Sequence, residues 1–236
     1  PKVLLAATHT ALSPTATLPI IPTETPLKED LEFLAFLEGL TAEAQFSGVV
    51  LFAIDGEPVL RQASGMADQA LAIPNQIDTK FNLGSMNKMF TAVAIMQLVE
   101  QGKLSVEDKI LDVIPDYPNR DVANAVTIHH LLTHTAGMGD CFTGDFFTTP
   151  AEQLKTIAGY LPLFVDKPLQ FKPGDQYSYS NEGYIVLGWI IERISGQSYF
   201  DYVRENIYLP AGMINTDAFE LDDPPPNLAN GYTTQD

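Results

Sequence analysis

Residues 82–100 read NLGSMNKMFTAVAIMQLVE, a short polar opening followed by a long apolar run. Only two polar residues interrupt residues 89–99, so this run predicts a helix that is buried in a core. The run is well short of the roughly 20 residues that cross a bilayer, and we expect no transmembrane segment. Gly102 is a typical helix stop. The stretch therefore places Ser85 at the beginning of a buried helix.

Ser85 and Lys88 form a Ser-x-x-Lys pattern in this opening. Residues three apart on a helix share a face, so the hydroxyl and the amine are expected side by side. A serine hydroxyl is a weak nucleophile until a base takes its proton, and a lysine shielded from water can serve as that base. Backbone N–H groups at the helix start would stabilise the negative oxygen formed in acyl transfer. The pattern is short, and alone it indicates such a site only weakly.

A second pattern, Tyr179 and Asn181 around one serine, stands directly before another helical stretch. A lysine ammonium stabilises the phenolate of a nearby tyrosine, which can then carry a proton to and from a serine. The asparagine amide can hold a substrate carbonyl. Tyr117 and Asn119 have the same spacing, but they lie in a proline-broken turn, and we favour the later pair.

Upstream of these motifs the sequence predicts one helix and two strands. Apolar residues recur at helical spacing from residue 27 until Gly39 closes the segment. Residues 47–54 are rich in β-branched and aromatic side chains, and Asp55-Gly56 after them is a strong hairpin signal. Residues 58–60 then resume an apolar strand.

Beyond Phe81 helices dominate the pattern. Pro115 ends one of them, Thr127 is the expected cap of another, and Ser195-Gly196 separates the last two. The helices expected after the first run cover residues 106–114, 128–133, 150–160, 182–194 and 199–208.

Composition limits the classes of partner. The chain has 236 residues, 45% hydrophobic and 18% charged, which suits a globular protein with a full core. A net charge of −17 would repel a phosphate backbone, so nucleic acid is not an expected partner. The single cysteine, Cys141, can form no internal disulfide. Residues 1–26 are expected to be a leader or flexible segment, and their character slightly favours a periplasmic or secreted protein.

Several residues have two interpretations. His130 and His134 are four apart, as in a metal-binding helix, but Leu131 stands where the HExxH motif needs Glu; packing or capping is favoured, and no metal is expected. Trp189 suits a core position better than a substrate platform. Met86 either fills the core or touches a ligand, and with Gly84 it is a candidate substrate contact beside the serine.

Five blocks in a fixed order make the chain resemble the serine β-lactamase-like hydrolases, which include class C β-lactamases, D-alanyl-D-alanine carboxypeptidases and family VIII esterases. The likeness runs from about residue 46 to residue 232. The blocks are GMAD at residues 65–68, DTKFNLGSMNK at 78–88, TIHHLLTHTAG at 127–137, FKPG at 171–174 and YSNEGY at 179–184.

The resemblance implies a role for four residues. Ser85 would be the acylated nucleophile, Lys88 the activating base and Tyr179 the general acid and base. Asn181 would contact the substrate. The implied reaction needs no cofactor, and it proceeds through an acyl-enzyme on an ester, a β-lactam or a D-amino-acid peptide. A small-molecule or peptide substrate is thus the expected partner, and the sequence leaves the oligomeric state open.

The resemblance also implies an α/β (α+β) fold of the β-lactamase/transpeptidase-like kind, with an antiparallel sheet flanked by helices and an all-helical domain. In this chain residues 27–84 would supply the helix and first two strands, and residues 85–236 the nucleophile helix and the helical domain. The family has a third motif, Lys or His followed by Ser/Thr and Gly, on a sheet strand. No Ser/Thr-Gly pair here follows Lys or His, so we expect the C-terminal strands to be absent from this chain.

This missing motif leaves a second hypothesis open. Because loss of one oxyanion donor typically lowers the rate by about 10²–10³, a chain that truly lacked the motif would not turn over its substrate. The alternative to a serine hydrolase is a catalytically inactive penicillin-binding-like or ligand-binding protein.

Overall fold

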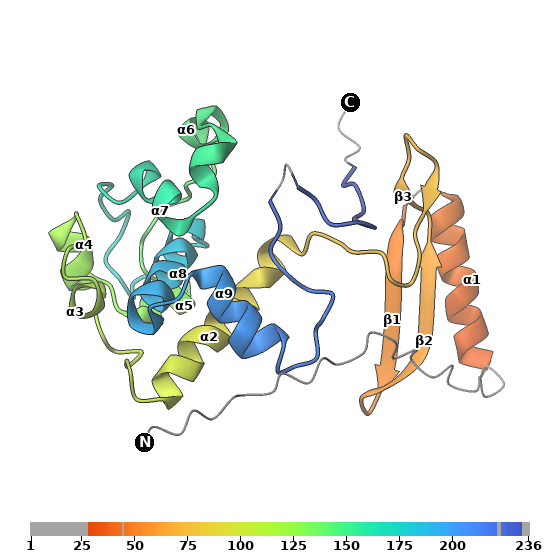
Figure 1. Ribbon diagram of the computed structural model, residues 1–236, viewed down its shortest axis with the longest axis horizontal. Coiled ribbons are helices and arrows are strands. Elements are labelled where there is room, and N and C mark those ends of the chain that lie inside the picture. The colour runs from red at the N-terminus through yellow and green to blue at the C-terminus, as the bar shows by residue number, and fades with distance from the viewer. Residues whose placement is uncertain (1–27, 44, 221–222, 233–236) are drawn as a thin grey trace, which may run out of the picture. The chain divides into compact units, whose positions relative to one another are not determined.

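Two compact units, residues 1–77 and 78–236, make up the chain (Figure 1). The computed structural model describes residues 28–43, 45–220 and 223–232. The leader expected at residues 1–26 lies outside these residues. The boundary that the sequence predicts, between the sheet part at residues 27–84 and the helical part at residues 85–236, stays a prediction.

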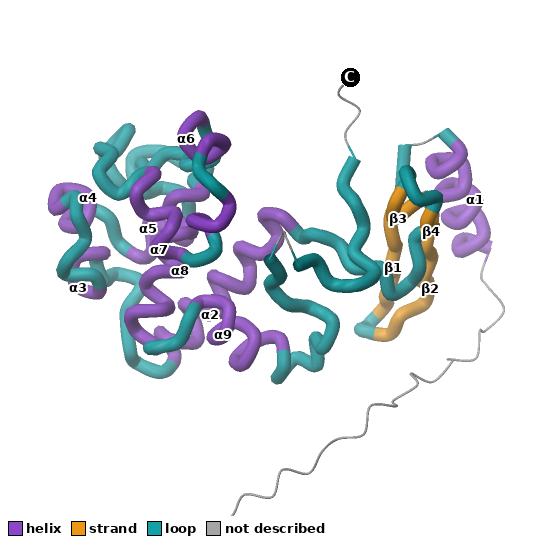
Figure 2. Tube along the Cα trace, turned by 45° about the horizontal axis from the view of Figure 1, so that its top comes forward, coloured by secondary structure: helices purple, strands orange, loops and turns teal. Residues whose placement is uncertain are grey.

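The first unit combines one helix with a β-hairpin. Helix α1 (Lys28–Ala42) packs against the second strand of the antiparallel pair β1 (Gly48–Ile54) and β2 (Glu57–Ser64) (Figures 1 and 2). Asp55 and Gly56 form the turn with φ of 50° and 82°. Two left-handed residues are what a tight two-residue hairpin requires, so the hairpin predicted at this dipeptide is confirmed.

Two further details of this unit differ from expectation or add to it. Helix α1 continues through Gly39 to Ala42, so the predicted end at this glycine is wrong; a glycine weakens a helix interior without breaking it. A second small antiparallel pair, which the sequence did not predict, joins β3 (Met66–Asp68) to β4 (Ile73–Pro74).

The core of the second unit forms around two long helices, α2 (Lys88–Glu100) and α8 (Asn181–Ser195), which pack against each other. Both were predicted, although the first turn before α2 is a 3-10 helix, η1 (Gly84–Asn87). The fully buried side chains of the pair are Ala94, Ile95 and Leu98 on α2 and Val186, Leu187, Ile190 and Ile191 on α8.

Shorter helices surround this pair (Figure 2). They include the predicted helix after Thr127, whose hydroxyl accepts a hydrogen bond from His130 N at 3.2 Å. In chain order they are α3 (Ile110–Val113), α4 (Arg120–Ala125), α5 (Ile128–Leu132), α6 (Gly144–Thr148), η2 (Ala151–Leu154), α7 (Ile157–Tyr160), η3 (Leu161–Leu163), α9 (Tyr199–Val203) and the π-helical turn η4 (Arg204–Tyr208).

Two of the predicted helices were too long. Residues 150–160 were expected to form one helix, but the extended backbone of Thr156 (φ −132°, ψ 159°) separates η2 from α7. Residues 106–114 contain only α3. The segment before it forms a turn at residues 106–107 and then becomes extended at Lys109, because Lys109 forms a bridge with Thr127 and Ile128 N donates to Asp108 O at 3.0 Å. Pairing with a distant segment thus replaces the local helix.

The segment that leads to Ser85 is paired with the far end of the described chain (Figure 1). Lys80 N donates to Asn227 O at 2.8 Å, and Ala229 N donates to Lys80 O at 2.9 Å. The Asn227 side chain adds a hydrogen bond to Asp78 O at 3.0 Å. These bonds fix the entry into η1.

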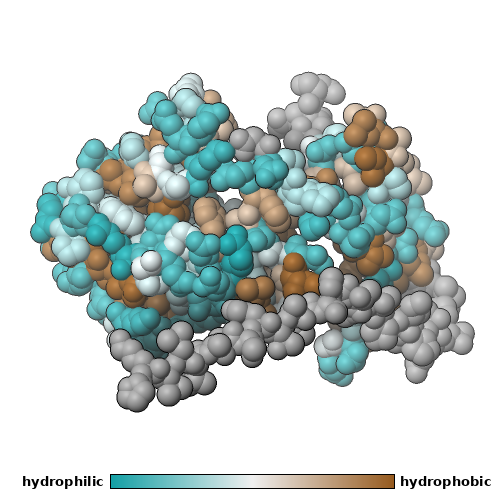
Figure 3. All heavy atoms as spheres, viewed as in Figure 1, coloured by the Kyte–Doolittle hydropathy of each residue, from teal (hydrophilic) through white to brown (hydrophobic). Residues whose placement is uncertain are grey.

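Polar residues cover most of the face of the second unit that is seen in Figure 3, with hydrophobic residues scattered among them. Within residues 28–43, 45–220 and 223–232, no helix combines the length and apolar character needed to span a membrane.

Gly137 occupies a backbone position that tolerates no side chain. Its φ is +76°, and a Cβ atom there would lie 2.4 Å from Phe171 O. We expect Gly137→Ala to lower the free energy of unfolding by about 2–4 kcal/mol, because strain and a backbone clash add together. Urea denaturation measures this change. Gly144→Ala is the matched control, since nothing lies within 4 Å of a Cβ at that position; equal effects of the two changes would contradict the prediction.

Candidate active site

Ser85 and Lys88 lie at the junction of η1 and α2, as the sequence predicted. Lys88 Nζ donates to Ser85 Oγ at 3.4 Å. The serine is exposed and the lysine is half-buried. The short 3-10 turn keeps the two side chains on one face, so the hydroxyl is open to a ligand while the amine reaches it from the protein side.

Gly84 makes the turn before the serine possible. Its φ is +51°, a left-handed conformation that residues with a Cβ rarely adopt. Its N–H donates to Asn82 Oδ1 at 2.8 Å. Met86, on the other side of Ser85, is 63% exposed. The structure therefore places both proposed substrate contacts next to the serine, and only Gly84 lines the cavity described below.

Tyr179 approaches Ser85 from the segment before α8. Its hydroxyl donates to Ser85 Oγ at 2.8 Å, and its ring lies 4.8 Å from Lys88 Nζ. Ser180 holds this segment at the helix start, because its Oγ accepts from Gly183 N at 3.1 Å and donates to Gly139 O at 2.7 Å. Tyr179, not the buried Tyr117, meets the serine and the lysine.

The Asn181 amide links Lys88 to a carboxylate. Lys88 Nζ donates to Asn181 Oδ1 at 2.7 Å, and Asn181 Nδ2 donates to Asp140 Oδ1 at 3.2 Å. An ammonium only donates and a carboxylate only accepts, so these two neighbours fix which way the amide points. Asp140 therefore orients the group that contacts the lysine.

The electrostatics of the site act on the Tyr179 phenol. Partial burial pushes its pKa upward, but hydrogen bonds with Lys88 and Ser85 and the charge of Lys88 outweigh this, and the pKa is lowered below its ordinary value of 10.0. The phenolate is thus easier to form here than in water.

A cavity of about 520 Å³ opens beside these polar groups. Ser85, Lys88 and Asn181 form part of its wall. Most of the remaining wall is apolar or aromatic, contributed by Phe142, Ile157, Tyr160, Tyr184, Ile185, Tyr199, Phe200, Val203, Tyr208 and Ala218.

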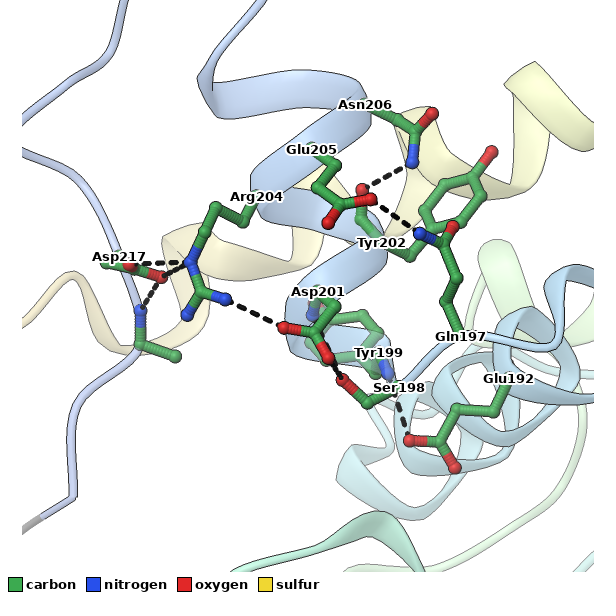
Figure 4. A network of polar contacts seen from close by, with 11 residues as sticks. Glu192, Gln197, Ser198, Tyr199, Asp201, Tyr202, Arg204, Glu205, Asn206 and Asp217 are labelled. Carbon is green, nitrogen blue, oxygen red and sulfur yellow. Dashed lines mark hydrogen bonds and ion pairs between the residues drawn. The ribbon is translucent and has the colours of Figure 1, made fainter. Parts of the chain in front are cut away.

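One wall of the cavity is held by an ion-pair network (Figure 4). Arg204 Nε donates to both Asp217 oxygens, at 3.0 and 2.7 Å, and its Nη1 donates to Asp201 Oδ1 at 2.8 Å. Figure 4 shows Arg204 reaching from its helix to Asp217 on a separate segment. Asp217 and Ala218 line the cavity, so this arginine fixes the segment that closes it.

Sequence reasoning missed two neighbours of the site. No motif in the sequence pointed to Asp140, and His134 was predicted to serve in packing or capping. The His134 ring lies 4.5 Å from the Tyr179 ring, and His134 Nδ1 accepts a hydrogen bond from Ser180 N at 3.1 Å. The block at residues 127–137 was the available signal, but the sequence did not indicate what this histidine contacts.

The remaining candidates make no described contact with Ser85, Lys88 or Tyr179. His130 caps its own helix, because its Nδ1 accepts from Thr127 N at 3.1 Å. Trp189 packs at the edge of the core, with its ring 5.9 Å from Tyr117. Burial raises the pKa of the Cys141 thiol to about 12, with the charge of Glu182 adding to this effect. In the described part of the chain, no group of three or more His, Cys, Asp or Glu side chains could hold a metal ion.

Residues 33–236 match the family model described as Beta-lactamase. A putative penicillin-binding protein of Bacillus subtilis (strain 168), PbpX, is 33% identical over 80% of this chain and 46% of its own length. The chain spans less than half the length of this relative and of two other penicillin-binding proteins that it matches.

Solved structures have the same fold. The penicillin binding protein from Bacillus halodurans aligns with a TM-score of 0.74 and 38% identity, over 83% of this chain and 60% of that one. EstCE1, a hydrolase with promiscuous acyltransferase activity, aligns with a TM-score of 0.64 and 27% identity, over 78% of this chain and 52% of that one. The helix-rich chain with its small antiparallel sheets thus has the fold class predicted from its sequence.

Proposed function

Since this chain belongs to the beta-lactamase family, we propose that the protein is a serine hydrolase that forms an acyl-enzyme on Ser85. Lys88 and Tyr179 would activate the serine together, with Tyr179 carrying the proton and Lys88 stabilising its phenolate, and Asn181 would hold Lys88 and contact the substrate. Gly84 and Met86 flank the serine as further candidate contacts. The proposal concerns the activity of the full natural protein, and Ser85, Lys88, Tyr179 and Asn181 are the residues of this chain on which it rests.

One observation carries the proposal: a phenol and an amine converge on a single exposed hydroxyl. Tyr179 OH is 2.8 Å from Ser85 Oγ, and Lys88 Nζ is 3.4 Å from the same oxygen. Both distances lie within reach of proton transfer or of a small adjustment that allows it. An exposed serine without such neighbours would be a weak nucleophile.

Acylation would begin when Ser85 Oγ attacks the carbonyl carbon of the substrate. Its proton passes to the Tyr179 phenolate, which the Lys88 ammonium stabilises. The backbone N–H of Ser85 lies in the first helical turn, where an N–H has no partner within the helix, and it is the proposed donor to the negative oxygen. As the tetrahedral intermediate collapses, the protonated Tyr179 returns the proton to the leaving group.

Deacylation would reverse these roles. A water molecule attacks the acyl carbon, and Tyr179 takes one proton from it. The bond from the acyl carbon to Ser85 Oγ then breaks, and the serine oxygen recovers a proton from the phenol. The acid product leaves, and the hydroxyl returns to its starting state.

The cavity supports a preference within the substrate classes. Its wall joins the reactive serine to a mostly apolar and aromatic surface, which suits a substrate whose acyl group carries an alkyl or aryl substituent. About 520 Å³ is at the lower end of the range of small-molecule pockets.

Chain length of the acyl group is therefore expected to affect the rate. With the full natural protein, kcat/KM for p-nitrophenyl esters should rise by about fourfold per methylene from acetate through butyrate, because each buried methylene contributes about 0.8 kcal/mol. Release of p-nitrophenol measures it. A constant or falling kcat/KM along this series would contradict the proposed use of the cavity.

Two matched variants test whether the dependence of kcat/KM on chain length arises in this cavity. Ala218 lines the cavity, so Ala218→Phe should narrow it and flatten the dependence on chain length. Ala211 is exposed and does not contribute to the cavity wall, so Ala211→Phe is the control.

Nitrocefin in parallel assays tests the β-lactam class. Acylation of Ser85 without turnover of either substrate would favour a ligand-binding protein.

A further inference from the structure

His134 sits among the tyrosines of the site. Its ring centroid lies 4.5 Å from that of Tyr179 and 5.0 Å from that of Tyr184, both at tilts near 30°. The Tyr177 ring is edge-on at 6.0 Å. Lys88 Nζ faces two of the same rings, 4.8 Å from Tyr179 and 5.4 Å from Tyr184. The imidazole is thus in direct contact with the proposed proton carrier.

The backbone contacts of His134 are equally specific. Its carbonyl oxygen accepts a hydrogen bond from Ser178 N at 2.9 Å, and its Nδ1 accepts one from Ser180 N at 3.1 Å. These two donors are the residues on either side of Tyr179. One residue therefore holds the backbone before and after the tyrosine and also contacts its ring.

We propose that His134 is a positioning residue that holds the Tyr179 phenol against Ser85, through its ring contact and through the hydrogen bond that Nδ1 accepts from Ser180 N. This inference rests on the proposed role of Tyr179 as the proton carrier. His134 itself touches neither Ser85 nor the reacting atoms among the described contacts. It acts through the tyrosine.

The bond to Ser180 N determines the chemical state of the imidazole. Nδ1 can accept a hydrogen bond only when it carries no proton, so the neutral ring must carry its proton on Nε2. Protonation to imidazolium would place a proton on Nδ1 and remove the acceptor. It would also bring a second positive charge close to Lys88.

The surroundings keep His134 neutral at moderate pH. The titratable and charged groups that face it are Lys88 from α2, Tyr184 from α8, and Tyr177 and Tyr179 from the segment before α8. Burial lowers the pKa of His134 below its ordinary value of 6.5, and the charge of Lys88 lowers it further. Since the folded protein favours the neutral form, the positioning contact persists above this lowered pKa and is lost as the pH falls through it.

Two variants separate the ring from the acceptor. His134→Phe keeps an aromatic ring but has no Nδ1, whereas His134→Asn keeps an acceptor atom bonded to Cγ. Asparagine also tolerates the left-handed backbone at this position, where φ is 57°. His129→Asn is the matched control, because His129 is exposed and makes no contact with the tyrosines.

The experiment compares kcat and KM of these variants in the full natural protein, with active sites counted by fluorophosphonate labelling. We expect His134→Phe to lower kcat by about 100-fold with little change in KM, because the Tyr179 hydroxyl would be displaced from its position against Ser85. His134→Asn should lose only about fivefold, the equivalent of one aromatic contact. In the unaltered protein, log kcat should fall more steeply with decreasing pH below the pKa of His134 than above it. His134→Asn should remove this additional fall.

Three outcomes would overturn the inference, and a fourth would refute the proposed function itself. An unchanged kcat and an unchanged pH slope in His134→Phe would overturn the inference. It would also be overturned if His134→Asn lost as much kcat as His134→Phe and kept the extra pH slope, because a purely structural role predicts that result. Long-range proton–nitrogen NMR tests the tautomer without any assay of activity, and a proton on Nδ1 would also overturn it. Full activity in Ser85→Ala would instead refute the proposed function.

Discussion

Replacing Ser85 with alanine is expected to abolish covalent labelling by a fluorophosphonate or a fluorescent penicillin, and to lower kcat by at least about 10⁴-fold. The reason is that Oγ is the only atom of the protein that bonds to the acyl carbon in the proposed mechanism. The fold should be unaffected, because the described contacts of Oγ run only to Lys88 and Tyr179. Mass spectrometry of the labelled full protein measures the result.

Ser178→Ala serves as the control for this change, since it removes a hydroxyl from the adjoining segment and leaves Ser85 intact. Labelling should persist in this variant, on the peptide that contains Ser85. Persistent labelling or turnover in Ser85→Ala would show that another nucleophile operates, and the proposed function would then have to be abandoned.

Tyr179→Phe is expected to lower kcat by about 10²–10⁴-fold, the usual contribution of a general acid and base. The hydroxyl at 2.8 Å from Ser85 Oγ is removed while the ring remains against His134. Because the Tyr179 phenolate is the proposed base, kcat/KM should rise with pH up to a pKa that lies below the ordinary 10.0. The variant should lose this rise, and initial rates across the pH range measure both effects.

Two other tyrosines make suitable controls. Tyr177→Phe alters a hydroxyl on the same segment, where the side chain is 70% exposed. Tyr117→Phe alters the tyrosine that has the same spacing to an asparagine as Tyr179, and Tyr117 is buried in the core. Both should retain kcat and the rise with pH. If Tyr179→Phe behaved like these controls, another group would have to carry the proton.

The sequence predicted what depends on local spacing. Ser85 and Lys88 are three residues apart at a helix start, and helix geometry alone brings them together. The turn at Asp55 and Gly56 was equally local, since both residues adopt the left-handed backbone that such a turn demands. Tyr179 was found because its motif stands at the start of α8, although its meeting with Ser85 is a tertiary contact.

The errors arose where distant segments decide the outcome. Residues 106–109 have a helical pattern, yet they form a turn followed by the extended residue Lys109, which is bridged to Thr127. Asp140 orients Asn181 across 41 residues, and Arg204 fixes a cavity wall through Asp217 on another segment. No periodicity encodes such contacts, because they depend on how complete elements pack.

The pairing of residues 78–80 with residues 226–229 has a consequence for how the protein reaches its native state. The asparagine contact alone joins positions that are 149 residues apart. Closing so long a loop costs only about 1.2 kcal/mol more than closing one a quarter as long, but contacts of high sequence separation slow folding. During synthesis, the helical core can form before residue 227 has left the ribosome. We therefore expect the segment that leads to Ser85 to be fixed only after helices α2 and α8 have packed against each other.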